Sequence, residues 1–272
     1  MSLLSIRRFG GIKLSLAITL CAIAVLALPL VLSLVSRTVN ILPRAFTSSR
    51  QQESQVVSHA YTTTFPLNET PISEGNEWIN GKAVGLNWTD VHTTRGLAFG
   101  TESGTNGYDD SAALLTGNWG SDQTAEATVH TVNQNDSIFE EVELRLRSNL
   151  SARSATGYEI NFRCSKTAKA YTQIVRWNGT LGNFTYIATV QGQKYGVANG
   201  DVVKATIKGN VITAYINGVQ VLQGRDKKFT TGNPGMGFFL QGASGVNSDY
   251  GFTRFTASDG SPSPSPLFNI AQ

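Results

Sequence analysis

Carboxylates that could act as a pair are concentrated in one short stretch of the sequence. Glu140, Glu141 and Glu143 lie close together, with a single valine between the last two. Residues two apart on a β-strand point to the same face. Glycoside hydrolysis uses two such groups, about 5–5.5 Å apart in a retaining enzyme and about 6.5–9.5 Å apart in an inverting one. The alternative is an ordinary solvated strand face, on which Arg145 and Arg147 are the neighbours of these carboxylates.

A second polar stretch follows shortly after the first. If the two stretches are adjacent strands, they bring five candidate ligand-binding residues to one surface: Arg145, Arg147, Glu159, Asn161 and Arg163. Guanidinium groups could bind an acidic sugar, because their geometry matches that of a carboxylate. A β-elimination lyase would need a His or Tyr base beside such groups. The same residues could instead form a cross-strand charge ladder, in which Glu143 and Glu159 pair the arginines.

Two tryptophans are candidates for stacking on sugar rings. Trp88 follows Asn87, and Trp177 precedes Asn178-Gly179, so both lie near predicted turns. Amphipathic aromatic side chains often cover sugar faces, and packing in the core or at its rim is the alternative.

Signals for a metal or another cofactor are sparse. The three histidines, His59, His92 and His130, are widely separated and have no metal-ligand spacing, so we assign no metal ligand. Asp109 and Asp110 lie in an oxygen-rich segment that could hold Ca²⁺, with an ordinary turn as the alternative. No phosphate-binding glycine loop, Gly-x-Ser-x-Gly elbow or Cys-x-x-Cys pair is present. We therefore assign no cofactor, with Ca²⁺ at Asp109 and Asp110 as the alternative.

The elements that must position these residues are short strands. Apolar and polar residues alternate with the period of two that is typical of half-buried strands, over 125–129, 142–147, 158–163, 202–207 and 211–216, and later strands are expected at 219–222, 237–240 and 252–255. Turns are expected at Lys208-Gly209-Asn210 and Asn217-Gly218, with positive φ at Asn210 and Gly218. No helical pattern of useful length follows residue 58. The sequence therefore predicts an all-β fold in which two antiparallel sheets close over one core.

The order of turn signals between Asn199 and Phe239 carries a resemblance. The signals are Gly200-Asp201, Gly209-Asn210, Asn217-Gly218, Asp226, and Gly232 with Gly235. In addition, Trp119-Gly120-Ser121-Asp122-Gln123 precedes a strand, and residues 251–255 fit a closing strand beside a first strand that includes Thr63-Thr64-Phe65. In these features the chain resembles concanavalin A-like lectin/glucanase domains, including laminin-G-like members. The resemblance implies a two-sheet antiparallel jelly-roll sandwich, with glycans often bound on its concave sheet or loops and Ca²⁺ in some members.

The resemblance does not extend to the glucanase motif. Glucanases of this fold carry a motif that resembles Glu-x-Asp-x-x-Glu. Here Glu143 stands in place of the Asp, and Leu146 stands in place of the last Glu. The fold hosts lectins, hydrolases, lyases and structural modules. We therefore expect a non-catalytic carbohydrate-binding module. The alternatives are a polysaccharide hydrolase or lyase, and a structural or adhesive domain with a protein partner.

The N-terminal segment predicts export. Residues 14–36 contain no charged side chain, and such a run is long enough to cross a bilayer as a helix. Residues 1–36 are therefore expected to be a signal anchor or a cleaved signal peptide. The domain is expected at the cell membrane on its extracytoplasmic side, or secreted if the segment is cleaved. We assign residues 37–58 to a linker, 59–257 to the jelly-roll domain and 258–272 to a Ser/Pro-rich tail.

The charge balance argues against a nucleic-acid partner. Six of the 22 basic residues lie in the first 50 positions, which leaves 16 basic against the 19 acidic residues in the remainder. This remainder has no basic stripe of the kind that binds nucleic acid. Of the two cysteines, Cys21 lies in the apolar run and Cys164 in the predicted domain. We expect no disulfide between them, and Cys164 is predicted to be a small buried apolar residue.

Overall fold

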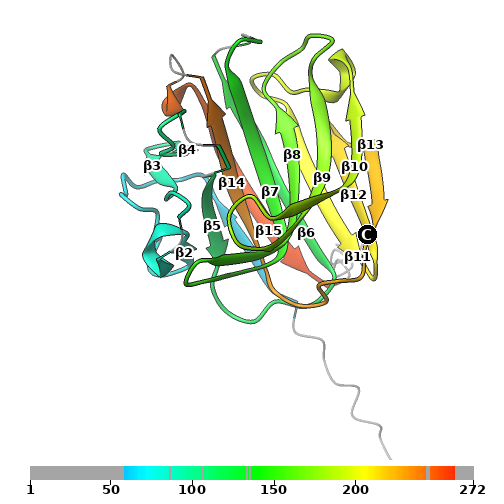
Figure 1. Cartoon of the computed structure of the whole chain (residues 1–272). Helices are drawn as coiled ribbons and strands as arrows, with labels where there is room; N and C mark the ends of the chain where they lie inside the picture. Colours follow the sequence, from blue (N-terminus) through cyan, green and yellow to red (C-terminus); the bar gives the residue numbers. More distant parts are fainter. Residues whose placement is uncertain are drawn as a thin grey trace, which may run out of the picture. The chain divides into compact units, whose positions relative to one another are not determined.

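The computed structural model describes residues 58–260 except 86, 106, 109, 133, 135 and 243–245. Two antiparallel sheets make up this part of the chain (Figure 1). The eight-stranded sheet has the order β13-β12-β11-β6-β15-β4-β3, with β1 paired to β15. Its strands are β1 (Ala60–Thr63), β3 (His92–Thr94), β4 (Leu97–Phe99), β6 (Gln123–Thr131), β11 (Val202–Lys208), β12 (Val211–Ile216), β13 (Val219–Arg225) and β15 (Tyr250–Asp259).

The seven-stranded sheet has the order β10-β9-β8-β7-β14-β5-β2. Its strands are β2 (Trp78–Asn80), β5 (Ser111–Leu115), β7 (Phe139–Ser151), β8 (Ser154–Arg163), β9 (Tyr171–Gly179), β10 (Phe184–Gln191) and β14 (Asn233–Gln241). Three short 3₁₀ helices complete the described elements, at Lys82–Val84 (η1), Gln193–Tyr195 (η2) and Asn247–Asp249 (η3). The predicted all-β, two-sheet antiparallel sandwich is confirmed.

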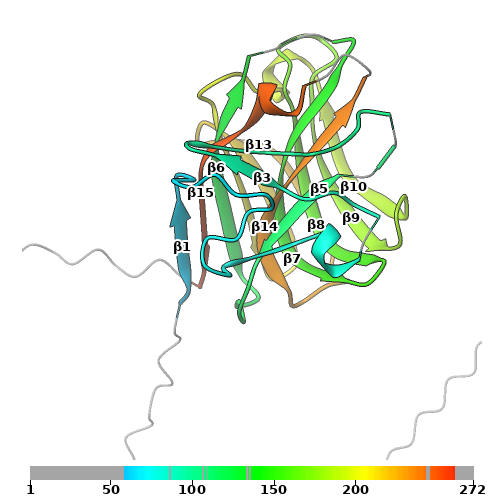
Figure 2. The ribbon, with the colours of Figure 1, turned by 90° about the vertical axis from the view of Figure 1, so that its left-hand side faces the viewer.

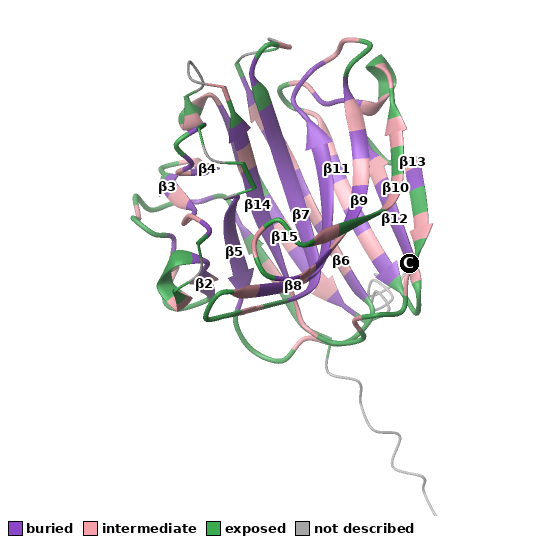
Figure 3. Cartoon of the chain, in the orientation of Figure 1, coloured by how far each residue is buried: buried purple, intermediate pink, exposed green. Residues whose placement is uncertain are grey.

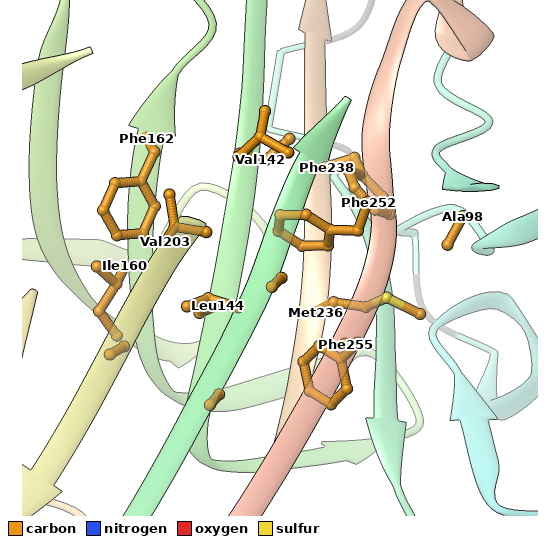
Figure 4. Packing of buried hydrophobic residues seen from close by; sticks show 14 of the residues in the cluster. Ala98, Val142, Leu144, Ile160, Phe162, Val203, Met236, Phe238, Phe252 and Phe255 are labelled. Atoms are coloured by element: carbon orange, nitrogen blue, oxygen red, sulfur yellow. The ribbon is translucent and has the colours of Figure 1, made fainter. Parts of the chain in front are cut away.

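The core lies between the two sheets (Figure 4). Phe252 of β15 packs against Phe238 of β14, with ring centroids 5.3 Å apart, and both side chains are fully buried. Val142 and Leu144 of β7 belong to the same buried cluster. Burying a large apolar side chain contributes roughly 1.5–3 kcal/mol, so closure of the sheets is driven by the inward face of each strand.

The predicted hairpin between residues 202 and 216 is confirmed, with one change in its turn. Lys208 pairs with Val211, so Gly209 and Asn210 form the connection between β11 and β12. Positive φ occurs at Gly209, with a value of 55°, rather than at Asn210 as predicted. Glycine adopts this conformation without the steric cost that a Cβ brings. The second turn has positive φ at Gly218 as predicted.

The two ends of the described residues are joined through β1 and β15. Thr63 pairs with Phe255, which confirms that the closing strand returns beside the first one (Figure 2). The Asp259 carboxylate accepts hydrogen bonds from the backbone N–H of Gly120, at 2.6 Å, and shares one of 2.8 Å with the His59 ring. One carboxylate therefore fastens both ends of the domain to the loop before β6.

Several predictions concern residues outside those described. These are the signal anchor or signal peptide at 1–36, nearly all of the linker at 37–58, and most of the tail at 258–272. Within the residues that the structure describes, no helix combines the length and the apolar character needed to cross a membrane. Cys164 is buried, as predicted.

The aromatic contact between the sheets supplies a test of the packing. Replacing Phe252 with Ala removes a fully buried ring and should lower the free energy of unfolding by about 3–5 kcal/mol. Chemical denaturation followed by tryptophan fluorescence measures this loss. The matched control is Arg254→Ala, which changes an exposed residue of the same strand and should shift stability by no more than about 0.5 kcal/mol. Equal losses in both variants would contradict the packing described.

Candidate functional site

The two polar stretches of the sequence meet on adjacent strands, as expected. The cross-strand partners in β7 and β8 are Glu141 with Arg163, Glu143 with Asn161, and Arg145 with Glu159. Because side chains alternate along a strand, these residues lie on the face of the seven-stranded sheet opposite to that of Val142 and Leu144. They therefore occupy the outer face, away from the core.

This outer face is buried rather than solvated. Both faces of β7 and β8 are buried along most of their length (Figure 3), whereas β6 alternates between buried and half-buried residues. The reading of β7 as an ordinary solvated strand face is therefore wrong. A sequence pattern of alternating polar residues cannot reveal that another part of the chain covers them. Here Trp88, from the segment between η1 and β3, lies over Arg145, with the guanidinium carbon 5.0 Å from the ring centroid.

Arg145 stands among three carboxyl groups, and these four residues form the Arg145 cluster. Its Nη2 lies 2.6 Å from Glu143, 2.6 Å from Glu159 and 3.3 Å from Asp110. All four side chains are 1–5% exposed. The charge-ladder alternative is therefore confirmed for Arg145, since it pairs with its neighbour along the strand and with its partner across it.

The cluster has more carboxyl groups than cations. Burial raises the pKa of Asp110 and Glu143 well above their ordinary values, and repulsion from Glu159 adds to the rise, against the opposing effect of Arg145. Burial lowers the pKa of Arg145, but the three carboxyl groups outweigh this effect and raise it. Protons are therefore retained on the cluster, because several buried like charges cannot all ionise beside one guanidinium.

The same carboxyl groups are close enough to one another to hold a metal ion. One oxygen from each of Asp110, Glu143 and Glu159 lies within 4.8 Å of the others. Nη2 of Arg145, however, lies within 3.3 Å of all three carboxyl groups, so a guanidinium supplies the positive charge that a metal ion would bring. The Ca²⁺ expectation also involved Asp109, which lies outside the described residues.

Gly237 of β14 makes room for the cluster. A Cβ at this position would lie 2.2 Å from Oε2 of Glu143 and 2.9 Å from Nε of Arg145. Real Cβ atoms do not approach other atoms so closely, and the two contacted groups are held by their ion pair. The ion pair between Glu143 and Arg145 on β7 therefore requires a glycine at position 237 of β14.

Two of the predicted arginines are engaged elsewhere. A bulge at Arg147, with φ of 45°, breaks the alternation of β7, and its guanidinium donates to the carbonyl oxygens of Ser121 and Phe229. Arg147 therefore does not join the Arg145 cluster. Arg163 donates to the carbonyl oxygen of Ile138 at 2.7 Å, with its guanidinium carbon 3.8 Å from the Phe139 ring centroid. Both side chains are buried, and Nη1 of Arg163 has no hydrogen-bond partner within the described residues.

The two predicted tryptophans pack against each other. The ring centroids of Trp88 and Trp177 are 4.5 Å apart with an edge-to-face angle of 67°, and both residues are buried. Trp177 also donates from Nε1 to Glu159 at 2.6 Å. These contacts leave little ring surface for stacking on a ligand, although Trp177 still lines the cleft described next.

A cleft of about 320 Å³ opens on this outer face. Three exposed aromatic residues line it: Tyr108 (49% exposed), Phe139 (40%) and Tyr186 (55%). Its polar lining includes Asp110, Glu141, Glu143, Glu159, Asn161 and Gln173. Of the candidates chosen from the sequence, Glu159, Asn161 and Trp177 line the cleft, whereas Arg145 lies among its lining carboxylates.

Sequence reasoning missed the contributions of β9 and β10. Tyr171 and Gln173 come from β9 and Tyr186 from β10, and neither strand was predicted. The signal was present, because Tyr171, Gln173, Val175 and Trp177 follow the period of two and all line the cleft. Only the pairing of β8 with β9 shows that this stretch continues the polar face.

Glu141 is the carboxyl group of the cleft that forms no ion pair within the described residues, although Arg163 lies across from it on β8 and lowers its pKa. It accepts a hydrogen bond from the Tyr171 hydroxyl, and the neighbouring Asn161 side chain lowers its pKa. Among the described residues, no arginine or lysine nitrogen lies within 4.0 Å of its carboxylate. Burial raises the pKa of Glu141 to about 7, an effect that the hydrogen bond from Tyr171 only partly opposes. This residue therefore exchanges its proton near neutral pH.

Comparisons with known proteins agree with this architecture. No protein-family model and no curated protein matches the chain. Among solved structures, the potassium-bound carbohydrate recognition domain of Emp46p is 15% identical, with a TM-score of 0.50 over 72% of this chain and 95% of that one. Carbohydrate binding module CBM66 from Bacillus subtilis is 17% identical, with a TM-score of 0.44 over 70% and 96%. The kappa-carrageenase zobellia_236 from Zobellia galactanivorans is 11% identical, with a TM-score of 0.45 over 76% and 98%.

At these identities the likeness concerns the fold alone. The described residues form two antiparallel sheets, and their first strand pairs with their last. The longer strands of one sheet have a polar outer face. The chain therefore has the concanavalin A-like jelly-roll fold that its sequence resembles.

Proposed function

We propose that this domain binds a glycan in the cleft of the seven-stranded sheet and does so without catalysis. The observation that carries the proposal is the combination of exposed aromatic rings with buried carboxyl and amide groups in one cleft. Sugar rings present apolar faces and polar edges, so a site for them needs both kinds of group. The Emp46p domain that this chain resembles in fold is a carbohydrate recognition domain, which supports the same function.

The three exposed aromatic residues, Tyr108, Phe139 and Tyr186, form the aromatic rim of the cleft. This rim supplies the apolar contacts with the sugar. Phe139 lies at the start of β7 and Tyr186 in the edge strand β10, so they flank the cleft from strands far apart in the sheet order. The Tyr186 ring packs edge-to-face on Phe184, with centroids 5.3 Å apart. This contact orients the Tyr186 ring, so the side chain loses less conformational entropy when a ligand binds.

Hydrolysis is a second candidate function, and one observation favours it. Glu141 and Glu143 lie two apart on β7 and both line the cleft, and a carboxyl group with a pKa of about 7 suits a general acid. Against this candidate, Glu143 is held by Arg145, and Leu146 is buried in the core. We therefore place binding before hydrolysis.

The location of the domain belongs to the proposal as well. We propose that it functions outside the cytoplasm, either anchored by residues 1–36 or released after their cleavage. The support is the charge-free run of residues 14–36 and its suitability for export.

Binding through the aromatic rim is tested by Tyr186→Ala. The substitution removes a half-exposed ring of the cleft. It should weaken binding to any glycan that the unchanged protein binds by about tenfold. Affinity electrophoresis or titration calorimetry against a panel of polysaccharides measures the change. The matched control is Tyr215→Ala on the eight-stranded sheet, which should bind as the unchanged protein does. Equal affinities for all three proteins would remove the rim from the site.

Catalysis is tested by product analysis with the same panel. We expect no new reducing ends and no unsaturated uronic product, because Glu143, the second carboxyl group that hydrolysis would need, is held by Arg145. Release of reducing ends that is lost in Glu141→Gln, but retained in Glu126→Gln on the other sheet, would establish hydrolysis instead.

The raised pKa of Glu141 predicts a pH dependence of stability. Its pKa rises from 4.5 to about 7 on folding, so the native state holds the proton more tightly than the unfolded chain does. The contribution of Glu141 to stability is therefore complete below pH 4.5 and is lost as the pH rises through 7. Glu141→Gln should be more stable than the unchanged protein at pH 8, by at most about 3 kcal/mol, and nearly equal to it at pH 4.5. Denaturation at both pH values measures this, and a constant difference would contradict the assignment.

A further inference from the structure

Carboxyl groups outnumber cations in and around the cleft. Glu141, Glu143, Glu159 and Asp110 contribute carboxyl oxygens, and the guanidinium among them, that of Arg145, is already shared by three of these groups. A ligand for such a site must bring donors, because acceptors that are buried without a partner lose the hydrogen bonds they made with water.

Asn161 shows where one donor is required. It is 7% exposed and lines the cleft. It lies opposite Glu143 and diagonally across from Glu141, and its Oδ1 has no partner within the described residues. A buried amide oxygen without a partner has lost its hydrogen bond to water, so a ligand that donates to it would restore that bond. This orphaned acceptor points to a ligand independently of the carboxylates.

Glu141 shows which kind of donor suits the site. Its carboxylate is buried and lacks a cation within 4.0 Å among the described residues. Since Asn161 is the diagonal cross-strand neighbour of Glu141 on the same face of the sheet, one group of a ligand can reach both acceptors. A neutral hydroxyl offers a single proton, whereas an ammonium offers three together with a positive charge.

We propose that the cleft selects glycans with free amino groups, and that the sugar ammonium binds between the Glu141 carboxylate and Oδ1 of Asn161. This inference rests on the proposed glycan-binding function and specifies its ligand class. Uronic and sulfated glycans are disfavoured, because they would bring an anion beside Glu141, which has no ion-pair partner among the described residues. The acceptors of the cleft select for ammonium, and its rim of aromatic rings contacts the faces of the same sugars.

Three sets of oligosaccharides of equal length test the ligand class. They are glucosamine oligomers, N-acetylglucosamine oligomers and galacturonate oligomers, titrated calorimetrically into the full chain at constant ionic strength. We expect the glucosamine oligomers to bind roughly 10–100-fold more tightly than the acetylated ones, the range expected for one charge-assisted hydrogen bond. Galacturonate oligomers should bind most weakly of the three.

Two variants assign the preference to the site. Glu141→Gln keeps the shape of the side chain and should remove most of the preference for the free amine. Glu126→Gln makes the same charge change on β6 of the other sheet, at a half-buried position, and should keep the preference. A preference that survives Glu141→Gln, or binding with no preference for the amine, would overturn the inference and leave glycan binding intact. If no oligosaccharide binds, the proposed function itself fails.

Discussion

Burying the guanidinium of Arg145 is the constraint on which the outer face of the seven-stranded sheet depends. Removing an arginine from water costs several kcal/mol unless its hydrogen bonds and charge are matched. Here the matching groups come from β7, from β8 and from the residue before β5. The cluster therefore fixes these three segments relative to one another, and it requires a glycine in β14 beside it. Trp88 then completes the cover over the charges.

The same constraint decides the chemistry that the cleft can offer. Guanidinium groups would suit acidic sugars if they were free, but each of Arg145, Arg147 and Arg163 donates to protein acceptors, which leaves Nε of Arg145 and Nη1 of Arg163 without a partner in the described residues. What remains open to a ligand is a set of carboxyl and amide oxygens under a rim of aromatic rings. The charged residues chosen from the sequence therefore still form the site. The sequence suggested that arginines bind an anionic ligand, whereas in the structure the carboxyl groups are the ones open to a ligand.

The strands could be predicted wherever one face meets the core and the other meets water. This holds for β6, whose residues alternate strictly between buried and half-buried, and for the hairpin of β11 and β12. It fails for the outer face of β7 and β8, where polar residues alternate as if exposed but are covered. The bulge at Arg147 was also unforeseen. It depends on Gly157 in the paired strand, where a Cβ would lie 2.5 Å from the Cα of Ser148.

By itself the sequence determined the fold class, many of the longer strands, their turns and the polar residues that β7 and β8 contribute to the site. Those features follow from local periodicity and from the conformations that glycine and asparagine allow. The tertiary structure alone decided that these polar residues are buried, that Arg145 is neutralised, and that Glu141 and Asn161 face a cleft. The physical reason is that burial and charge pairing depend on segments far apart in the chain, such as Asp110 and Glu159, whose proximity no local pattern encodes.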